Sequence, residues 1–78
     1  MKKSKILLSD HAKKQRIERK IPLKDILQTV KNPETKLKSF KNRRLLQREF
    51  DDKILEVVTV KEEDLTIIVT EYYLEEEL

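Results

Sequence analysis

The sequence predicts an α+β domain in which a short N-terminal strand is followed by two helices that pack on one face of an antiparallel sheet of four to five strands. Residues 65–73 form the longest run rich in β-branched and aromatic residues and contain neither Pro nor Gly, which is typical of a strand inside a sheet. Residues 23–30 have apolar side chains at helical spacing, which predicts a helix with one buried face. The chain has 78 residues, 37% hydrophobic and 42% charged, which is enough for one domain (residues 1–78) with a modest core.

The helices follow an N-terminal strand predicted over residues 5–8. Ser9 is a suitable N-cap for a basic helix that extends to about residue 20 and has few apolar residues in its interior. A second helix begins near Pro22, because proline is tolerated in a first helical turn, and it ends at Asn32-Pro33. Its buried stripe is predicted from the i, i+3, i+4, i+7 spacing of Leu23, Ile26, Leu27 and Val30.

Four strands are predicted to complete the sheet as an antiparallel meander over residues 35–40, 44–50, 54–60 and 65–73. Asn and Asp occupy the turns between them, in a chain that contains no glycine. Residues 74–78 are predicted to form an acidic tail. In the last strand, regular alternation predicts one face with Leu65, Ile67 and Val69, and another with Ile68, Thr70 and Tyr72.

The charge is distributed unevenly along the chain. Residues 1–48 contain 16 Lys/Arg and four Asp/Glu, a net charge of +12, whereas residues 49–78 contain two and 11, a net charge of −9. This asymmetry predicts a basic surface for a polyanion, together with an acidic region that pairs with it internally or binds a basic partner. The alternative is a set of solvated faces that neutralise one another across the fold.

Several classes of site and location are disfavoured by composition. The absence of cysteine excludes disulfides, thiolate metal sites and a cysteine nucleophile. A single histidine with scattered acids gives no metal-ligand spacing, so we expect no metal and no cofactor. The charged start of the chain is followed by only three apolar residues, too few for a signal peptide, and no run reaches membrane-spanning length. We therefore expect a cytoplasmic protein.

His11 is the first candidate for a catalytic residue. A helix places His11, Gln15 and Arg19 at successive i+4 steps on one side. Imidazole can act as a base near neutral pH, and guanidinium can clamp a phosphate through two donors. The alternative is a structural histidine hydrogen-bonded to backbone at the start of the helix. Further cations on this helix that could contact a polyanion are Lys13, Lys14 and Arg16.

A second basic group lies on the meander at Arg43, Arg44 and Arg48. Alternation places Arg44 and Arg48 on one strand face, where they could line a phosphate-binding groove. Equally, Arg48 could pair with a carboxylate on the neighbouring strand, such as Glu56. At the end of the last strand, Tyr72 could stack on a base or donate a proton, although packing is the commoner role of such a tyrosine.

The order of several short motifs resembles a family of small uncharacterised prokaryotic proteins. That family has His-Ala, a basic helix ending in Arg-Gly-Ile-Ser, an acidic-Ile helix, Asn-Pro-acidic and a closing Val-Thr-x-Tyr. The chain departs from the pattern at Gln15, where Arg is frequent, at Lys20, where Gly is usual, and at Pro22, where Ser is usual. The matching positions are His11-Ala12, Arg19, Ile21, Asp25-Ile26, Asn32-Pro33-Glu34 and Val69-Thr70-Glu71-Tyr72.

This family in turn is similar to the RelE/ParE-type toxin superfamily. The resemblance implies two helices against an antiparallel sheet, with a cleft on the face away from the helices. Active members of that superfamily are metal-independent ribonucleases, often blocked by an antitoxin protein, whereas others act on different targets or are inert. The first hypothesis is therefore a toxin-like endoribonuclease acting on RNA and directed by a ribosome or a partner. If the protein cleaves RNA, the expected base is His11, Arg19 and Arg48 stabilise the transition state, and Tyr72 protonates or hydrogen-bonds the leaving oxygen. Expected RNA contacts are Lys13, Lys14, Arg16, Arg43, Arg44 and Thr70.

Two other hypotheses remain open at this point. One is a non-catalytic RNA- or protein-binding module of the same fold, which needs only a continuous basic surface. The other is an interaction protein whose acidic residues, at 62–64 and in the tail, bind a basic partner. Catalysis would require His11 and the arginines to converge on Thr70 and Tyr72.

Overall fold

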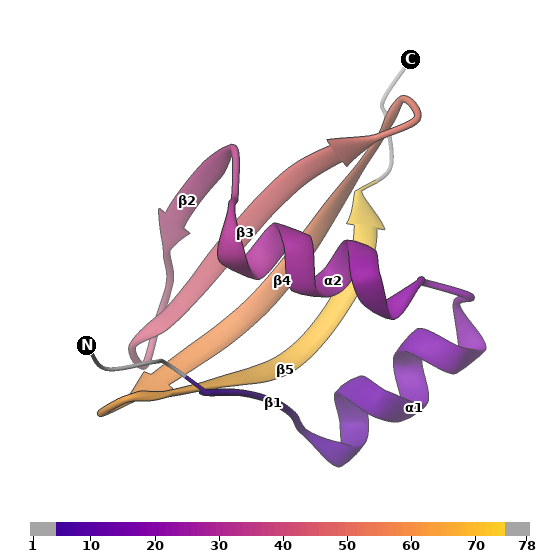
Figure 1. Cartoon of the computed structure of the whole chain (residues 1–78). Coiled ribbons are helices and arrows are strands. Elements are labelled where there is room, and N and C mark those ends of the chain that lie inside the picture. Colours follow the sequence, from indigo (N-terminus) through magenta and orange to yellow (C-terminus); the bar gives the residue numbers. More distant parts are fainter. Residues whose placement is uncertain (1–4, 75–78) are drawn as a thin grey trace.

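A computed structural model describes residues 5–74 (Figure 1). The predicted acidic tail lies outside the described residues except for Leu74, the last residue of the final strand. The chain forms, in order, β1 (Lys5–Leu8), α1 (Asp10–Glu18), α2 (Leu23–Lys31), β2 (Thr35–Lys38), β3 (Arg43–Phe50), β4 (Lys53–Glu62) and β5 (Leu65–Leu74).

The strands form one five-stranded sheet in the order β1-β5-β4-β3-β2. The last four strands are an antiparallel meander, as predicted. β1, however, pairs with β5 in parallel, from Lys5 opposite Leu65 to Leu8 opposite Ile68, so the sheet is mixed and not wholly antiparallel. The α+β fold class is confirmed, whereas the direction of β1 is corrected. The two helices connect β1 to the far edge of the sheet, so the direction of β1 is not set by a hairpin.

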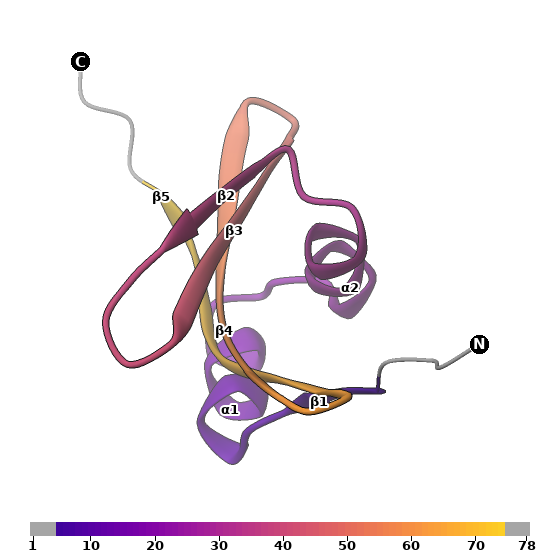
Figure 2. The same cartoon turned by 90° about the vertical axis from the view of Figure 1, so that its left-hand side faces the viewer.

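Both helices cover one face of the sheet. α2 lies across β3 and β4, and α1 lies beside β5 (Figures 1 and 2). The core contains Ala12 from α1, Ile21 from the segment between the helices and Ile26 from α2. On the sheet side these residues meet Leu55, Val57 and Ile68, all fully buried.

The buried stripe of α2 differs in two positions from the predicted one. Ile26 is fully buried, but Leu23, the first residue of the helix, is 40% exposed. Thr29 is buried in addition, and its hydroxyl donates to the Asp25 carbonyl at 2.8 Å. That bond satisfies the polar atom, so threonine can occupy a core position of the helix.

The alternation predicted for the last strand is wrong beyond Ile68 because β5 contains a bulge. Val58 lies opposite Thr70 and Thr59 opposite Ile68, which leaves Val69 as an extra residue. Ile68 therefore faces the helices, and Thr70 and Tyr72 face the other way. The face that the helices leave uncovered, here called the open face, carries Gln47, Glu56, Val58, Thr70 and Tyr72.

Ser9 joins this bulge to the start of α1. Its backbone N–H donates to the Ile68 carbonyl at 3.0 Å, and its hydroxyl donates to the Val69 carbonyl at 3.1 Å. The same hydroxyl accepts the Ala12 N–H at 3.1 Å, which confirms Ser9 as the N-cap. α1 thus covers the part of the β5 edge that β1 leaves free.

Several non-glycine residues adopt the left-handed backbone conformation that favours glycine. Lys41, Asn42, Asp51 and Asp52 have positive φ in the hairpin turns, and the β2–β3 turn begins two residues earlier than predicted. Lys20, with φ 56°, ends α1. Its N–H donates to the Ile17 carbonyl, and the next N–H donates to the Arg16 carbonyl at 2.8 Å, a Schellman arrangement. This is the position at which glycine is usual in the resembling family.

Lys20→Gly is therefore expected to stabilise the protein by about 0.5–1 kcal/mol. A left-handed conformation costs a non-glycine residue about 1–2 kcal/mol, and the greater freedom of glycine in the unfolded chain offsets part of the gain. Urea unfolding followed by circular dichroism measures the change. Lys14→Gly, in the interior of α1, is the control and should lower stability by about 1 kcal/mol. A loss of stability in Lys20→Gly would contradict the assignment.

Among the residues that the structure describes, neither α1 nor α2 has the length and apolar composition of a membrane-spanning helix. Each of the two helices has nine residues.

Candidate functional site on the open face

Tyr72 and Glu56 form the centre of a polar cluster on the open face. They are cross-strand partners on β5 and β4, and the Tyr72 hydroxyl donates to Glu56 Oε1. From the other side, Gln47 on β3 lies opposite Glu56, and its amide Nε2 donates to Glu56 Oε2. Both carboxylate oxygens therefore accept a hydrogen bond, although Glu56 is only 6% exposed. Register on three adjacent strands brings these side chains together.

The environment keeps the Tyr72 phenol protonated. Burial, followed by the hydrogen bond to Glu56 and the negative charge of Glu56, raises the pKa of Tyr72 to about 12. The positive charge of Arg19 opposes this rise, so its guanidinium acts on the phenol electrostatically. Tyr72 is thus a neutral hydrogen-bond donor at physiological pH, next to a carboxylate and within the field of a cation.

Arg19 is positioned by the end of α1. It is the C-cap of that helix, and its Nη1 donates to the Glu71 carbonyl at 2.9 Å. That carbonyl belongs to the residue before Tyr72, on the stretch of β5 that has no β1 partner. The guanidinium retains donors that this bond does not use. We refer to Tyr72, Glu56, Gln47 and Arg19 as the tyrosine site.

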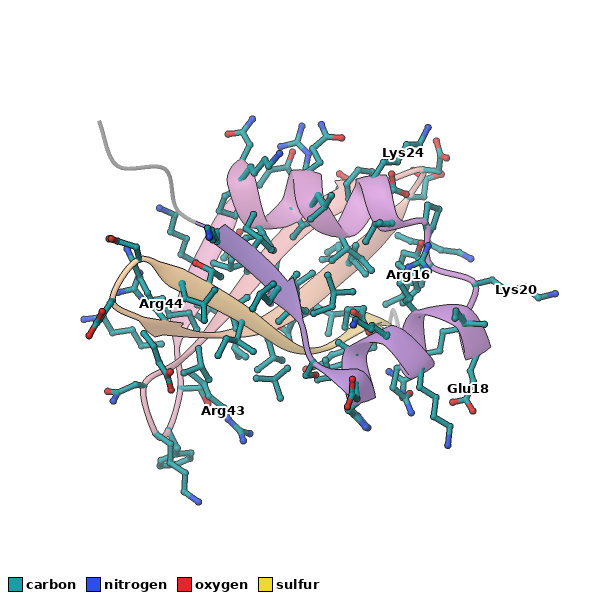
Figure 3. The ribbon with its side chains drawn as sticks, turned by 60° about the horizontal axis from the view of Figure 1, so that its bottom comes forward. Arg16, Glu18, Lys20, Lys24, Arg43 and Arg44 are labelled. Atoms are coloured by element: carbon teal, nitrogen blue, oxygen red, sulfur yellow. The ribbon has the colours of Figure 1, made fainter. Side chains whose placement is uncertain are left out.

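Glu71 and Arg16 form a second group of ionisable side chains, on the face of the sheet that the helices cover. Glu71 lies opposite Val57 and is fully buried, and both its carboxylate oxygens lack a hydrogen-bond partner among the described residues. Burial raises the pKa of Glu71, against the opposing charges of Arg19 and Arg16. Arg16 is half-buried, and its Nε atom likewise has no partner within residues 5–74. Figure 3 shows Arg16 extending from α1 between the two helices.

His11 lies on the same helix as Arg19 but at its other end. It is the second residue of α1, and its side chain is exposed. Arg19 is eight positions further along the chain, about 12 Å along a helix axis. The hydrogen bonds of the tyrosine site do not include His11. Lys13 and Lys14 are exposed on the same helix, and Thr70 is half-buried on the open face, two residues before Tyr72.

Arg48 lies apart from the tyrosine site. It is opposite Leu55, a core residue, and therefore faces the helices. Its Nη1 donates to the Asn32 carbonyl at the end of α2 at 2.8 Å, and its guanidinium carbon lies 6.0 Å from the centre of the Phe50 ring. The pairing of Arg48 with Glu56 considered from the sequence is not formed, because Gln47 is the neighbour of Glu56.

Arg43 and Arg44 lie near the β2–β3 turn and project to opposite faces of β3, opposite Val60 and Thr59 (Figure 3). With Lys38 and Lys61 they line a hollow of about 440 Å³ between the β2–β3 and β4–β5 turns. Glu63 is the only acidic residue in its lining, which also includes Ser39 and Asn42. We call this feature the basic hollow.

Glu56 and Gln47 were missed as site residues from the sequence. The sequence predicts Glu56 only as a possible partner for Arg48, because nothing in the spacing of β3 and β4 fixes their register. The one available signal was the acidic residue in the middle of an apolar strand, at Leu55-Glu56-Val57. A charge there requires partners. Within residues 5–74, no group of three or more His, Cys, Asp or Glu side chains is arranged to hold a metal ion.

The model of a family described as a domain of unknown function, DUF4258, matches residues 8–73, nearly the whole chain. The chain belongs to this family. Membership agrees with the resemblance to an uncharacterised family, and the matched segment includes the tyrosine site, α1 and the basic hollow. The DUF4258 description names no activity, and the likeness to RelE/ParE toxins stays a prediction. Comparisons with curated proteins and with solved structures gave no match.

Proposed function

We propose that this DUF4258 protein is a toxin-like endoribonuclease that cleaves RNA on the open face of its sheet without a metal ion. The observation that supports this most is the convergence of a phenol, a carboxylate and a guanidinium at the tyrosine site. These groups are a proton donor, a proton acceptor and a stabiliser of negative charge, which are the three that transesterification of RNA needs.

In this proposal Glu56 takes the proton from a ribose 2′-hydroxyl, and the oxygen attacks the adjacent phosphorus. Arg19 stabilises the negative charge that builds on the phosphoryl oxygens. The bond from phosphorus to the 5′-oxygen breaks, and Tyr72 protonates that oxygen, since an alkoxide is a stronger base than a phenolate whose conjugate acid has a pKa of about 12. The Tyr72–Glu56 hydrogen bond then returns the proton from Glu56 to Tyr72.

His11, Lys13, Lys14 and Thr70 have supporting roles in the proposal. His11 is not among the hydrogen-bonded residues of the tyrosine site, and about two turns of helix separate it from Arg19. The proposal therefore replaces the convergence of His11 on Tyr72 that was expected from the sequence: Glu56 acts as the base, and His11 would contact a neighbouring nucleotide. The exposed lysines of α1 would hold the RNA backbone. Thr70, on the same face as Tyr72, would contact the ribose or the base. Arg48, on the covered face, is left out of the reaction.

An antitoxin-type partner would be expected to cover the open face. Three large apolar side chains are exposed on it, two on the edge strands and one near the β3–β4 turn: Leu7 is 52% exposed, Leu37 45% and Ile54 36%. Their strand partners Ile67, Leu45 and Glu49 place them on the side of the sheet that carries Tyr72. A partner that buried these residues would also occlude the tyrosine site.

The second candidate function is a non-catalytic RNA-binding module. Both oxygens of Glu56 are occupied by Tyr72 and Gln47, as in a structural network. In that case the cluster would hold β3, β4 and β5 in register, and the basic residues alone would bind RNA.

Tyr72→Phe separates these functions. The purified protein is incubated with RNA and a metal chelator, and the rate of cleavage is measured. We expect cleavage by the wild type and a loss of about 100- to 1,000-fold in Tyr72→Phe, because one proton donor is removed. Tyr73→Phe is the matched control: Tyr73 faces the core, on the other side of β5, and its variant should cleave at the wild-type rate. Equal rates in both variants, or no cleavage by the wild type, would favour the binding module.

A further inference from the structure

Phe40, at the tip of the β2–β3 turn, is 88% exposed, the most exposed of the large hydrophobic side chains in residues 5–74. It lies between Ser39 and Lys41, and its carbonyl accepts the Arg43 N–H at 3.1 Å. The ring contributes little to the core at this exposure. The exposed ring, which follows Ser39 of the basic hollow in the chain, is therefore available to contact a ligand bound there.

The basic hollow collects cations from both hairpins. Lys38, Arg43 and Arg44 come from the β2–β3 hairpin and Lys61 from β4, against a single carboxylate, that of Glu63. The β2–β3 and β4–β5 turns lie at the same end of the sheet and point away from each other (Figures 1 and 2). Four positive charges around an open hollow of about 440 Å³ attract phosphate groups, and the Arg guanidinium groups can bind them through two donors.

We propose that this end of the sheet binds an unpaired nucleotide, with its phosphate in the basic hollow and its base stacked on Phe40. Stacking on an exposed ring requires a base with a free face, which single strands provide and duplexes do not. The inference rests on the RNA-binding part of the proposed function and names its substrate class, single-stranded RNA.

Strand β3 connects the basic hollow to the tyrosine site. The Arg43 side chain projects from the open face. So does the side chain of Gln47 in the tyrosine site, four residues further along β3. Four residues of strand extend about 13 Å. A single strand anchored at Phe40 would therefore pass Arg43 and reach Tyr72 with a neighbouring segment. Lys38, Arg44 and Lys61 line the hollow from the other face of the sheet, so the phosphate would be bound at the end of the sheet and Arg43 would lead the strand onto the open face.

The test uses a fluorescently labelled 2′-O-methyl oligouridine, which has no free 2′-hydroxyl and cannot be cleaved by the proposed reaction. Because the chain contains no tryptophan, Phe40→Trp introduces a single reporter at the tip. Binding is followed by anisotropy of the label and stacking by quenching of the tryptophan. We expect quenching in Phe40→Trp but not in Leu23→Trp, whose reporter would be at the exposed start of α2, next to Lys24 and far from the basic hollow.

Phe40→Ala is expected to weaken binding about 10- to 100-fold, because one base loses its stacking partner. Arg44→Gln should weaken binding and make the slope of log affinity against log salt shallower by about 0.7, because one phosphate is no longer neutralised. Lys24→Gln, on α2 at the far end of the molecule in Figure 3, should retain the wild-type affinity. Absence of binding by the wild type, binding without quenching in Phe40→Trp, or wild-type affinity in Phe40→Ala would overturn the inference.

These outcomes are distinct from those of the cleavage assay. A protein that shows stacking at Phe40 but no cleavage retains this site and loses the proposed catalysis. A protein that cleaves RNA but binds it equally well without Phe40 retains the catalysis and loses this site.

Discussion

Glu56→Gln is expected to slow RNA cleavage by about 100- to 10,000-fold, the usual range for removing a general base. The amide retains the shape of the carboxylate and can still accept from Tyr72, but it cannot take a proton from the ribose. The cluster, in which Glu56 accepts from Tyr72 and Gln47, should therefore remain folded. Initial rates on a labelled RNA in the presence of chelator measure the effect.

Glu49→Gln is the matched control for this variant. Glu49 is an exposed carboxylate on β3, opposite Ile54, and so projects from the open face but outside the tyrosine site. Its replacement removes the same charge and should leave the rate unchanged. If Glu49→Gln and Glu56→Gln lose activity equally, net charge would explain the effect and Glu56 would have no specific role.

Ile26→Ala is expected to destabilise the fold by about 2–5 kcal/mol. Ile26 is fully buried, and α2 is the main apolar element that covers the sheet. A domain of 78 residues has a total stability of roughly 4–12 kcal/mol. Truncation of this one side chain would thus remove a large part of the total and leave a substantial unfolded population.

Urea unfolding followed by circular dichroism measures this loss. Ile17→Ala is the control, because Ile17 has the same side chain but is 69% exposed on α1, and its truncation should change stability by no more than about 0.5 kcal/mol. A similar small change in both variants would contradict the assignment of the core.

The elements of this fold follow from the sequence to a large extent. The strong helix of residues 23–31 combines a regular apolar spacing with Asn32-Pro33 as its stop. The cap at Ser9 and the left-handed turns at Asn42 and Asp52 reflect local chemistry that a linear sequence carries. These features depend on neighbours in the chain, so sequence patterns predict them.

The faces of the strands are harder to predict. The bulge at Val69 has no Gly or Pro to mark it, and it is stabilised by Ser9, sixty residues earlier in the chain. A strictly alternating pattern therefore assigned Ile68 to the side of Tyr72. On β3, Leu45 and Leu46 are adjacent, so the apolar pattern does not tell which of them faces the core. The structure buries Leu46, and this choice directs Arg48 to the helices and Gln47 to the open face.

Only some residues of the candidate site can be predicted from the sequence, because the others depend on which face of its strand each side chain occupies. Tyr72, Thr70 and Arg19 come from the chain segments that the resemblance identified, and the structure brings Arg19 to the carbonyl next to Tyr72. Glu56 and Gln47 enter the site only through the register of β3 and β4 with β5. That register is a property of the assembled sheet, and no local motif encodes it.

The chemical identity of the product ends tests the central claim most directly. The wild-type protein is incubated with RNA in the presence of chelator, and the new ends are identified, with Glu56→Gln purified in the same way to exclude a contaminating nuclease. Attack by the ribose 2′-hydroxyl predicts a 2′,3′-cyclic phosphate on one product and a free 5′-hydroxyl on the other. Intact RNA, or products that carry a 5′-phosphate, would contradict it.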